Sequence, residues 1–344
     1  MAEFTFADLY CGGGGASLGL KQAGLKHLWG IDSDKAACAT YEANIGKAIC
    51  ADAASVDWAA LERPDVLWAS PPCQGFSVAG KRQKDDPRNF LVWGFVWAVA
   101  VLRPRAFICE NVPGVGQGDW AQFPSIVRMA LETLGYNVSV FKIDAVDYSV
   151  PQHRKRVFWA GCLEGWIRIP SPTHAEGGML GLKPWVTVRE ALGIPGSVLW
   201  KDDLYNKPSR DGEDRVYDVS EAPAPSIDGR TGGRPKLVFP SRPVLAGNDK
   251  GTNPLSGEPP SIDAPHHAID HTGFSLKTHT KAEQSMGGDR LYRRLTVADC
   301  LVLQGFPRDF VVKGNKTQQY RQVGNAVPPP VAEALARSAL ENLR

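Results

Sequence analysis

DLYCGGGGASLGL, residues 8–20, is the stretch that decides the fold of this 344-residue chain. The apolar residues 4–10 before the glycines predict a β-strand, and residues 16–23 after them predict a helix. Glycines between a strand and a helix permit positive φ angles, and the helix N-terminus offers N–H donors to a carboxylate or phosphate. The stretch therefore predicts a nucleotide-type loop, with a glycine-rich tight turn as the alternative.

The same alternation of strand and helix continues through the first half of the chain. Further strands are predicted at residues 27–31, 65–69, 106–110 and 136–143, and helices at residues 34–44, 89–102 and 123–134. Such alternation predicts an α/β fold, a doubly wound and mostly parallel sheet with helices on both faces. Ligands bind such sheets beyond the carboxyl ends of the strands.

The composition changes near Gly165. Residues 165–290 are rich in proline and glycine and lack helical periodicity, which predicts a second, smaller domain of loops and short strands. Regular patterns return with helices at residues 296–303 and 331–343, the first with Thr296 as its N-cap and Asp299 three residues later. We therefore expect one domain from residues 1–164 plus 291–344, and a second domain from residues 165–290.

Charge and cysteine content restrict the class of protein. The net charge of +2 gives no polybasic tail, although a local basic groove remains compatible with it. The seven cysteines are odd in number and show no zinc-ligand spacing, so we expect reduced thiols in a cytoplasmic protein and no metal. No stretch of about 18 apolar residues occurs, so we expect no membrane span. All cysteines except Cys73 are expected to be small buried apolar residues.

Two aspartates extend the ligand prediction. Asp32 ends the second predicted strand, where an acidic side chain can bind ribose hydroxyls. Asp52 follows another short segment and could accept a hydrogen bond from an adenine amino group. Each alone could be a helix cap or turn residue, but the ordered series favours an adenosine-type ligand. No Lys-Ser or Lys-Thr pair follows the glycines, which argues against a triphosphate site.

Two further segments carry reactive side chains at strand ends. In SPPCQGFS, residues 70–77, two prolines stiffen the backbone before Cys73, so this thiol is presented where the sheet opens. Glu110 ends another strand, where a carboxylate is costly unless it is paired or protonated; a solvated loop position is the alternative.

Six stretches in register resemble the DNA cytosine carbon-5 methyltransferase family of bacteria and phages, over nearly the whole chain. They are DLYCGGGGASLGL (8–20), PPCQGFS (71–77), ENV (110–112), QHRKRVF (152–158), RRLTVADCLVLQGFP (293–307) and QVGNAVPP (322–329).

The resemblance implies a Rossmann-like methyltransferase fold and a covalent mechanism. It makes Cys73 the nucleophile that adds to carbon 6 of a cytosine flipped out of duplex DNA, so that carbon 5 can accept a methyl group. Glu110 is expected to contact ring nitrogen 3, Arg154 to hold the base carbonyl, and Arg156 to support them. The methyl donor would be S-adenosylmethionine and the product S-adenosylhomocysteine.

The resemblance also assigns binding residues. Those expected to hold the methyl donor are Asp8, Tyr10, Gly12, Gly14, Asp32, Asp52, Pro71, Leu91, Asn325 and Ala326. Those expected to contact DNA in the loop after the thiol are Gln74, Ser77, Lys81, Arg82 and Arg88. Residues 165–290 would be the target-recognition domain, with Arg230 and Arg234 as base-reading candidates and a plain surface hairpin as the alternative.

The implied biology is that of a bacterial or phage monomer, cytoplasmic and associated with the nucleoid, that acts on duplex DNA beside a separate cognate restriction endonuclease. Two other classes stay open. The tRNA-modifying branch that resembles these enzymes carries a Cys-Phe-Thr signature in its recognition region. An RNA cytosine methyltransferase is therefore disfavoured, because this chain has no cysteine between Cys162 and Cys300. A non-catalytic DNA-binding module is disfavoured because Cys73, Glu110, Arg154 and Asn325 are all present.

Overall fold

The computed structural model describes residues 3–72, 91–116, 118–194, 199–201, 216–218, 222–224, 236–240 and 290–343. Among them, no helix is long and apolar enough to cross a bilayer.

A seven-stranded sheet forms the centre of the molecule, in the order β3-β2-β1-β4-β5-β7-β6. Its strands are β1 (Thr5–Leu9), β2 (Lys26–Asp32), β3 (Ala48–Cys50), β4 (Val66–Ala69), β5 (Ala106–Asn111), β6 (Asn137–Asp144) and β7 (Lys155–Cys162). The first five are parallel to one another, whereas β7 is antiparallel to both β5 and β6. The predicted mostly parallel sheet is confirmed.

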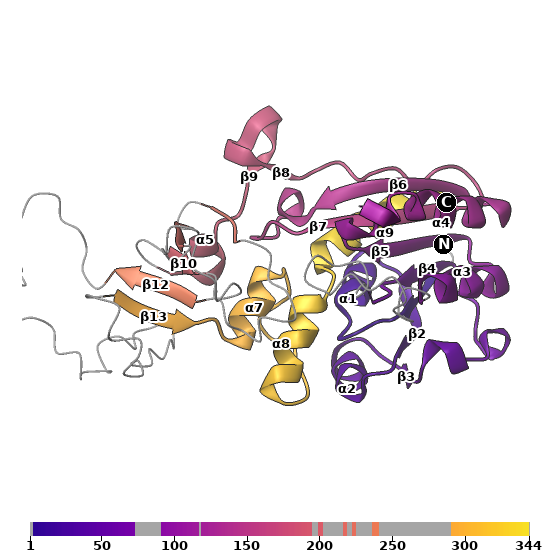
Figure 1. The fold of residues 1–344 in the computed structure, drawn as a ribbon, viewed down its shortest axis with the longest axis horizontal. Helices are drawn as coiled ribbons and strands as arrows, with labels where there is room; N and C mark the ends of the chain where they lie inside the picture. Colours follow the sequence, from indigo (N-terminus) through magenta and orange to yellow (C-terminus); the bar gives the residue numbers. More distant parts are fainter. Residues whose placement is uncertain are drawn as a thin grey trace, which may run out of the picture.

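Helices cover both faces of this sheet because successive strand residues point to opposite sides. Phe6 packs in the core beneath α1 (Gly15–Gln22) and α9 (Pro329–Leu340), whereas Ala7 packs beneath α3 (Leu91–Leu102) and α4 (Phe123–Thr133). The first pair is close because α1 turns glycines towards α9: a Cβ at Gly19 would lie 2.3 Å from the Pro329 carbonyl oxygen. The N-terminal and C-terminal ends of the chain thus form one layer (Figure 1).

The strand order reverses between β1 and β4. From β1 the chain proceeds to β2 and β3 at one side, with α2 (Lys35–Asn44) between them, and then returns to β4 on the other side of β1. The carboxyl ends of β1 and β4 therefore flank a topological switch point, the place where open α/β sheets bind ligands.

A second group of elements lies beside the sheet. A four-stranded sheet has the order β11-β10-β12-β13, formed by β10 (Leu199–Lys201), β11 (Val216–Asp218), β12 (Lys236–Pro240) and β13 (Arg290–Arg294). In Figure 1, α7 (Val297–Leu303) and α8 (Lys316–Asn325) lie between the two sheets. Both pack with α5 (Val188–Leu192) in a separate apolar cluster, and β8 (His174–Ala175) pairs with β9 (Lys183–Pro184).

Several local predictions can be compared with these elements. Thr296 caps α7 in a capping box with Asp299, as predicted. The strand β3 and the helix α8 were not expected, and α9 begins two residues earlier than predicted. The apolar helix α3 buries one face, including Phe95 and Val99, against the sheet, while Trp97 on its other side is 62% exposed.

Candidate active site

The strand register aligns four residues along the carboxyl edge of the sheet. Leu9 of β1 pairs with Ile31 of β2 and Ala69 of β4, and Ala69 pairs with Cys109 of β5. The next residues on these strands are Asp32, Tyr10, Ser70 and Glu110, which therefore form one row across the switch point. Neighbouring strands lie about 5 Å apart, so the row brings the candidate donor-binding and catalytic side chains into one site.

The glycine loop begins at this row and has a strained backbone. Tyr10, Gly12 and Gly14 all have positive φ, 60°, 52° and 92°, which explains the need for glycine at two of these positions. The Gly12 N–H donates to Asp32 Oδ2 over 2.9 Å, so the acidic side chain holds the loop. The N-cap of α1 is Gly14, which has no side chain to bond the first N–H groups of the helix, so those before Ser17 can meet an anionic group.

Tyr10 and Asp52 lie on the same side of the loop. The Tyr10 hydroxyl donates to the Leu91 carbonyl oxygen over 2.9 Å, which connects the loop to the start of α3. Burial raises the pKa of Tyr10, and the charge of Asp52 raises it further. The exposed Asp52 carboxylate also accepts from the Ala54 N–H. The structure thus places Tyr10 in contact with Leu91 and within electrostatic range of Asp52.

Asp8 lies below the loop, completely buried. Its Oδ2 accepts from the Ser17 hydroxyl over 2.6 Å, and Ser17 also bonds the Tyr41 hydroxyl over 2.7 Å. Burial raises the pKa of Asp8 to about 7, and the nearby charge of Asp32 acts in the same direction. Asp8 supports the loop from beneath, so its predicted contact with a ligand would have to be made from this position.

The residues before the candidate nucleophile are held against β5. Pro71 is buried, and its carbonyl oxygen lies 3.5 Å from the Asn111 Nδ2 that donates to it. Pro72 follows and is exposed. The candidates that lie outside the described residues are Cys73, Gln74, Ser77, Lys81, Arg82, Arg88, Arg230 and Arg234.

Glu110 is buried, at 8% exposure, and is paired rather than solvated. Arg156 at the start of β7 reaches it because β7 runs antiparallel to β5, and the Arg156 Nε lies 2.8 Å from Glu110 Oε1. Burial raises the pKa of Glu110, while the charges of Arg156 and Arg154 lower it. A carboxyl group under these opposing influences is suited to hold or donate a proton.

Arg154 belongs to a buried network that reaches the C-terminal helices. It is 2% exposed, and its guanidinium donates to the Gly324 carbonyl oxygen over 3.0 Å. Gln152 donates to the Leu303 carbonyl oxygen over 3.1 Å, and Gln304 donates to the Val323 carbonyl oxygen over 2.8 Å. The site is therefore completed by residues that are far away in the sequence.

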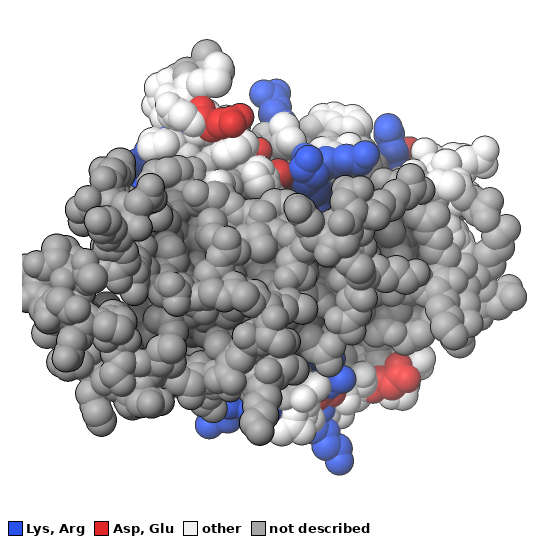
Figure 2. Space-filling view, turned by 60° about the vertical axis from the view of Figure 1, so that its left-hand side comes forward, with Lys and Arg blue, Asp and Glu red and all other residues white. Residues whose placement is uncertain are grey.

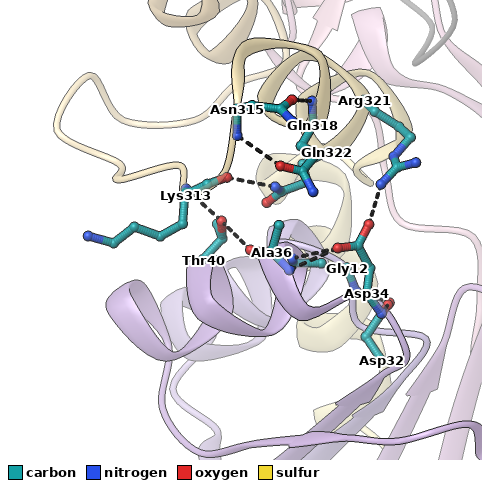
Figure 3. A network of polar contacts seen from close by, with 11 residues as sticks. Gly12, Asp32, Asp34, Ala36, Thr40, Lys313, Asn315, Gln318, Arg321 and Gln322 are labelled. Carbon is teal, nitrogen blue, oxygen red and sulfur yellow. Dashed lines mark hydrogen bonds and ion pairs between the residues drawn. The ribbon is translucent and has the colours of Figure 1, made fainter.

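The last turn of α8 brings Asn325 and Ala326 to the glycine loop. Asn325 ends the helix and is exposed, and Ala326 is its C-cap. The loop approaches closely, because a Cβ at Gly15 would lie 3.2 Å from the Ala326 Cβ. Figure 3 shows α8 standing above Gly12 and Asp32, with Arg321 paired to Asp34 and Gln322 bonded to Lys313.

Sequence reasoning missed Asp34, Arg321 and Gln322, whose partners are distant in the chain. One expectation about the thiols was wrong: Cys50 is exposed because it ends the short edge strand β3. Within the described ranges, no group of three or more His, Cys, Asp or Glu side chains could hold a metal ion.

Comparisons with known proteins agree with this geometry. The chain is 32% identical to the type II methyltransferase M1.HphI of Haemophilus parahaemolyticus, over 98% of this chain and 87% of the relative. It is 30% identical to the type II methyltransferase M.MthTI of Methanothermobacter thermautotrophicus, over 99% and 98%.

Two solved structures share the fold. A putative DNA modification methyltransferase encoded within an E. coli prophage superposes with a TM-score of 0.60 at 22% identity, covering 99% of both chains. The S. pombe Dnmt2 methyltransferase gives 0.64 at 18% identity, covering 99% of this chain and all of the other.

The family model of the C-5 cytosine-specific DNA methylases matches residues 4–341. The chain therefore belongs to this family of enzymes, whose general reaction is the S-adenosylmethionine-dependent methylation of cytosine at carbon 5.

Proposed function

We propose that this protein methylates carbon 5 of a cytosine within a specific duplex DNA sequence, with Cys73 as the nucleophile. The observation that carries the proposal is the row of Asp32, Tyr10, Ser70 and Glu110 at the switch point, with Cys73 only three residues beyond Ser70. A donor-binding loop, a reactive thiol and a buried acid are thereby assigned to one site.

The residues of the site fit S-adenosylmethionine. The uncapped N-terminus of α1 suits the carboxylate of its amino acid part, and Asp32 suits the ribose hydroxyls. At Gly12 an added Cβ would meet nothing within 4 Å, so the loop faces open space that a ligand can occupy. Tyr10 and Asp52 flank the position for the adenine, and Asn325 and Ala326 close the amino acid end. The bound donor supplies an electrophilic methyl group.

Cys73 prepares the cytosine for this transfer. Carbon 5 is a weak nucleophile until a thiolate adds to carbon 6, which converts the ring into an enamine. After carbon 5 has gained the methyl group, a base, for which water suffices, removes the proton at carbon 5. The sulfur–carbon bond then breaks and Cys73 leaves as thiolate.

Glu110 and the two arginines stabilise the ring during this addition. The raised pKa of Glu110 favours its protonated form, which can donate to ring nitrogen 3 as electron density moves there. Arg156 holds the Glu110 side chain in place. Arg154 serves the base carbonyl from the buried network behind the site.

The cytosine ring can be reached only after it leaves the duplex. Because the proposed site lies at the carboxyl edge of the sheet, the DNA must lie across that edge. We assign the phosphate contacts to Gln74, Ser77, Lys81, Arg82 and Arg88, and target recognition to the domain of residues 165–290, including Arg230 and Arg234. In Figure 2, Lys and Arg side chains of the described residues stand at the upper and lower edges of the view, together with a few Asp and Glu side chains. Positive side chains of this kind bind DNA phosphates.

The relatives are named type II methyltransferases, which supports a role beside a restriction endonuclease. We propose that the protein acts as a cytoplasmic, nucleoid-associated monomer that protects DNA from a separate cognate endonuclease.

A covalent trapping experiment tests the function. Duplex DNA in which 5-fluorocytosine replaces cytosine should form an adduct that resists denaturing electrophoresis. A base can remove hydrogen from carbon 5 as a proton but cannot remove fluorine in this way, so Cys73 stays bound to carbon 6. The adduct should require S-adenosylmethionine and disappear in Cys73→Ser. In parallel reactions with a labelled methyl donor, methyl groups should be transferred to duplex DNA and not to tRNA. Labelling of tRNA alone, or no adduct on any genomic DNA, would refute the proposal.

A further inference from the structure

Residues 311–322, named here the C-terminal latch, run along one side of α2 that includes Thr40 and Asn44. At the far end of α2, Asn44 makes two hydrogen bonds to Val311: Asn44 Nδ2 donates to the carbonyl oxygen over 2.8 Å, and Asn44 Oδ1 accepts from the N–H over 2.9 Å. Next along the helix, the Lys313 N–H donates to Thr40 Oγ1 over 2.8 Å (Figure 3). The latch is thus bonded to α2 at Asn44 and Thr40, and the Thr40 side chain also faces the glycine loop, because a Cβ at Gly13 would lie 3.2 Å from its Cγ2.

At the other end of α2, the latch is connected to the donor site by a chain of polar contacts. Arg321 pairs with the Asp34 carboxylate. Asp34 caps α2 through the Ala36 N–H, and its own N–H donates to Asp32 Oδ1 over 2.8 Å. Asp32 in turn accepts from the Gly12 N–H. Loss of the Arg321 guanidinium would therefore remove a positive charge from Asp34, which is bonded to Asp32 and, through Asp32, to Gly12 of the loop.

The latch also contacts the loop directly. Gln322 is buried and donates to the Lys313 carbonyl oxygen over 2.9 Å. Its Oε1 faces the loop, because a Cβ at Gly13 would lie 3.3 Å from that atom. Asn325 and Ala326 follow within one helical turn. The position of the latch on α2 thus sets where the end of α8 stands above the glycine loop.

We infer that the C-terminal latch is a positioning device for the methyl donor, and that Asn44 and Arg321 are its positioning residues. The inference rests on the proposed function, in which Asp32 holds the ribose end of S-adenosylmethionine and Asn325 the amino acid end. By fixing α8 on α2, the latch sets the distance between these two ends. Asn44 and Arg321 would thus act on donor binding through the position of α8.

Asn44 provides the clearest test because of its location. It ends a ten-residue helix that starts beside Asp32, so it lies about 15 Å from that residue along the helix axis. The Asn44 side chain is bonded to Val311, so its effect on the donor is expected to pass through the latch. Exposed hydrogen bonds and ion pairs have modest net strength, so loss of either latch contact should weaken donor binding by about threefold to tenfold.

The experiment measures S-adenosylmethionine binding by isothermal titration calorimetry and steady-state methylation of duplex DNA. The variants are Asn44→Ala and Arg321→Gln, with Arg321→Lys to restore the ion pair. Arg128→Gln is the matched control, because Arg128 pairs with Glu132 within α4 and is exposed to a similar degree. Thermal unfolding without ligand shows whether each variant is folded.

The latch predicts a raised Kd and a raised KM for S-adenosylmethionine in Asn44→Ala and Arg321→Gln, with kcat and the KM for DNA unchanged. Arg321→Lys should return close to the wild-type values, and Arg128→Gln should match them. Wild-type donor affinity in both Asn44→Ala and Arg321→Gln would overturn the inference, as would an equal loss in Arg128→Gln. Absence of donor binding by the wild-type protein would instead refute the proposed function.

Discussion

The close packing of α1 on α9 gives a quantitative prediction for Gly19→Ala. The added Cβ would lie 2.3 Å from the Pro329 carbonyl oxygen, and 2.7 Å from both the Ala332 Cβ and the Glu333 nitrogen. Two of these three atoms belong to the backbone of α9, so no side-chain rotation can relieve the contacts. The two helices must separate by roughly 1 Å to restore ordinary contact distances.

The expected change in stability is the difference between two opposing effects. Overpacking of this kind costs about 1–3 kcal/mol, and the upper half of that range applies because backbone atoms are involved. Alanine in a helix interior recovers about 1 kcal/mol relative to glycine. The net loss in the free energy of unfolding should be about 1–2 kcal/mol. At about 2–4 °C per kcal/mol, the Tm should fall by roughly 2–8 °C.

Donor binding should also suffer, because α1 begins at the glycine loop and moves with it. Chemical denaturation and differential scanning calorimetry measure the stability loss, and titration calorimetry measures the affinity for S-adenosylmethionine. Gln22→Ala is the control, since it places alanine on the exposed side of the same helix. The packing argument fails if Gly19→Ala is as stable as Gln22→Ala, or if it binds the donor with wild-type affinity.

Three further perturbations test other parts of the site. Arg156 lowers the pKa of the buried Glu110, so Arg156→Gln should shift the alkaline limb of the kcat/KM profile to higher pH; an unmoved limb would contradict this pairing. Gly94→Ala would bring a Cβ within 2.8 Å of the Tyr10 hydroxyl, and should raise the KM for the donor while leaving the Tm nearly unchanged. Burial raises the pKa of Asp8 from 3.8 to about 7, so the unfolded chain loses this proton first and stability should fall as pH rises through that interval. Urea denaturation across the interval should show a flatter dependence in Asp8→Asn.

Local sequence patterns were sufficient to predict most of the central sheet. The strands around Trp68 and Ile108 contain continuous apolar runs, as expected for strands that are covered on both faces. The antiparallel β7 between β5 and β6 could not be predicted, because alternation of strand and helix does not specify the order of strands. β3 has three residues, too few for a recognisable period.

The helix α8 shows why part of the site was missed. Its sequence KTQQYRQVGN is mostly polar, and it buries only Gln322, Val323 and Gly324. An apolar stripe was therefore absent. The helix starts at a capping box of Asn315 with Gln318, and the segment just before it is bonded to α2. Those contacts join residues more than 250 positions apart, which no local pattern can reveal.

The candidate residues divide in the same way. Asp32, Tyr10 and Glu110 could be predicted because each ends a strand of a parallel sheet, and the carboxyl ends of such strands share one edge. The pairing of Glu110 with Arg156 depends on the antiparallel register of β5 and β7, and the pairing of Asp34 with Arg321 on the docking of α8. Sequence thus predicts which strand ends carry the chemistry, and tertiary packing decides their partners.

The position of α8 links the two halves of the proposed reaction. On its donor side, Gln322 faces Gly13 and Arg321 pairs with Asp34; on its other side, the Gly324 carbonyl oxygen accepts from Arg154, which acts on Glu110. A displacement of the whole helix would therefore alter the donor site and the cytosine site together, whereas loss of one latch contact acts first on the donor side. Because methyl transfer requires the sulfonium carbon and carbon 5 to be aligned, one rigid helix that contacts both sites is a physical means of keeping that alignment.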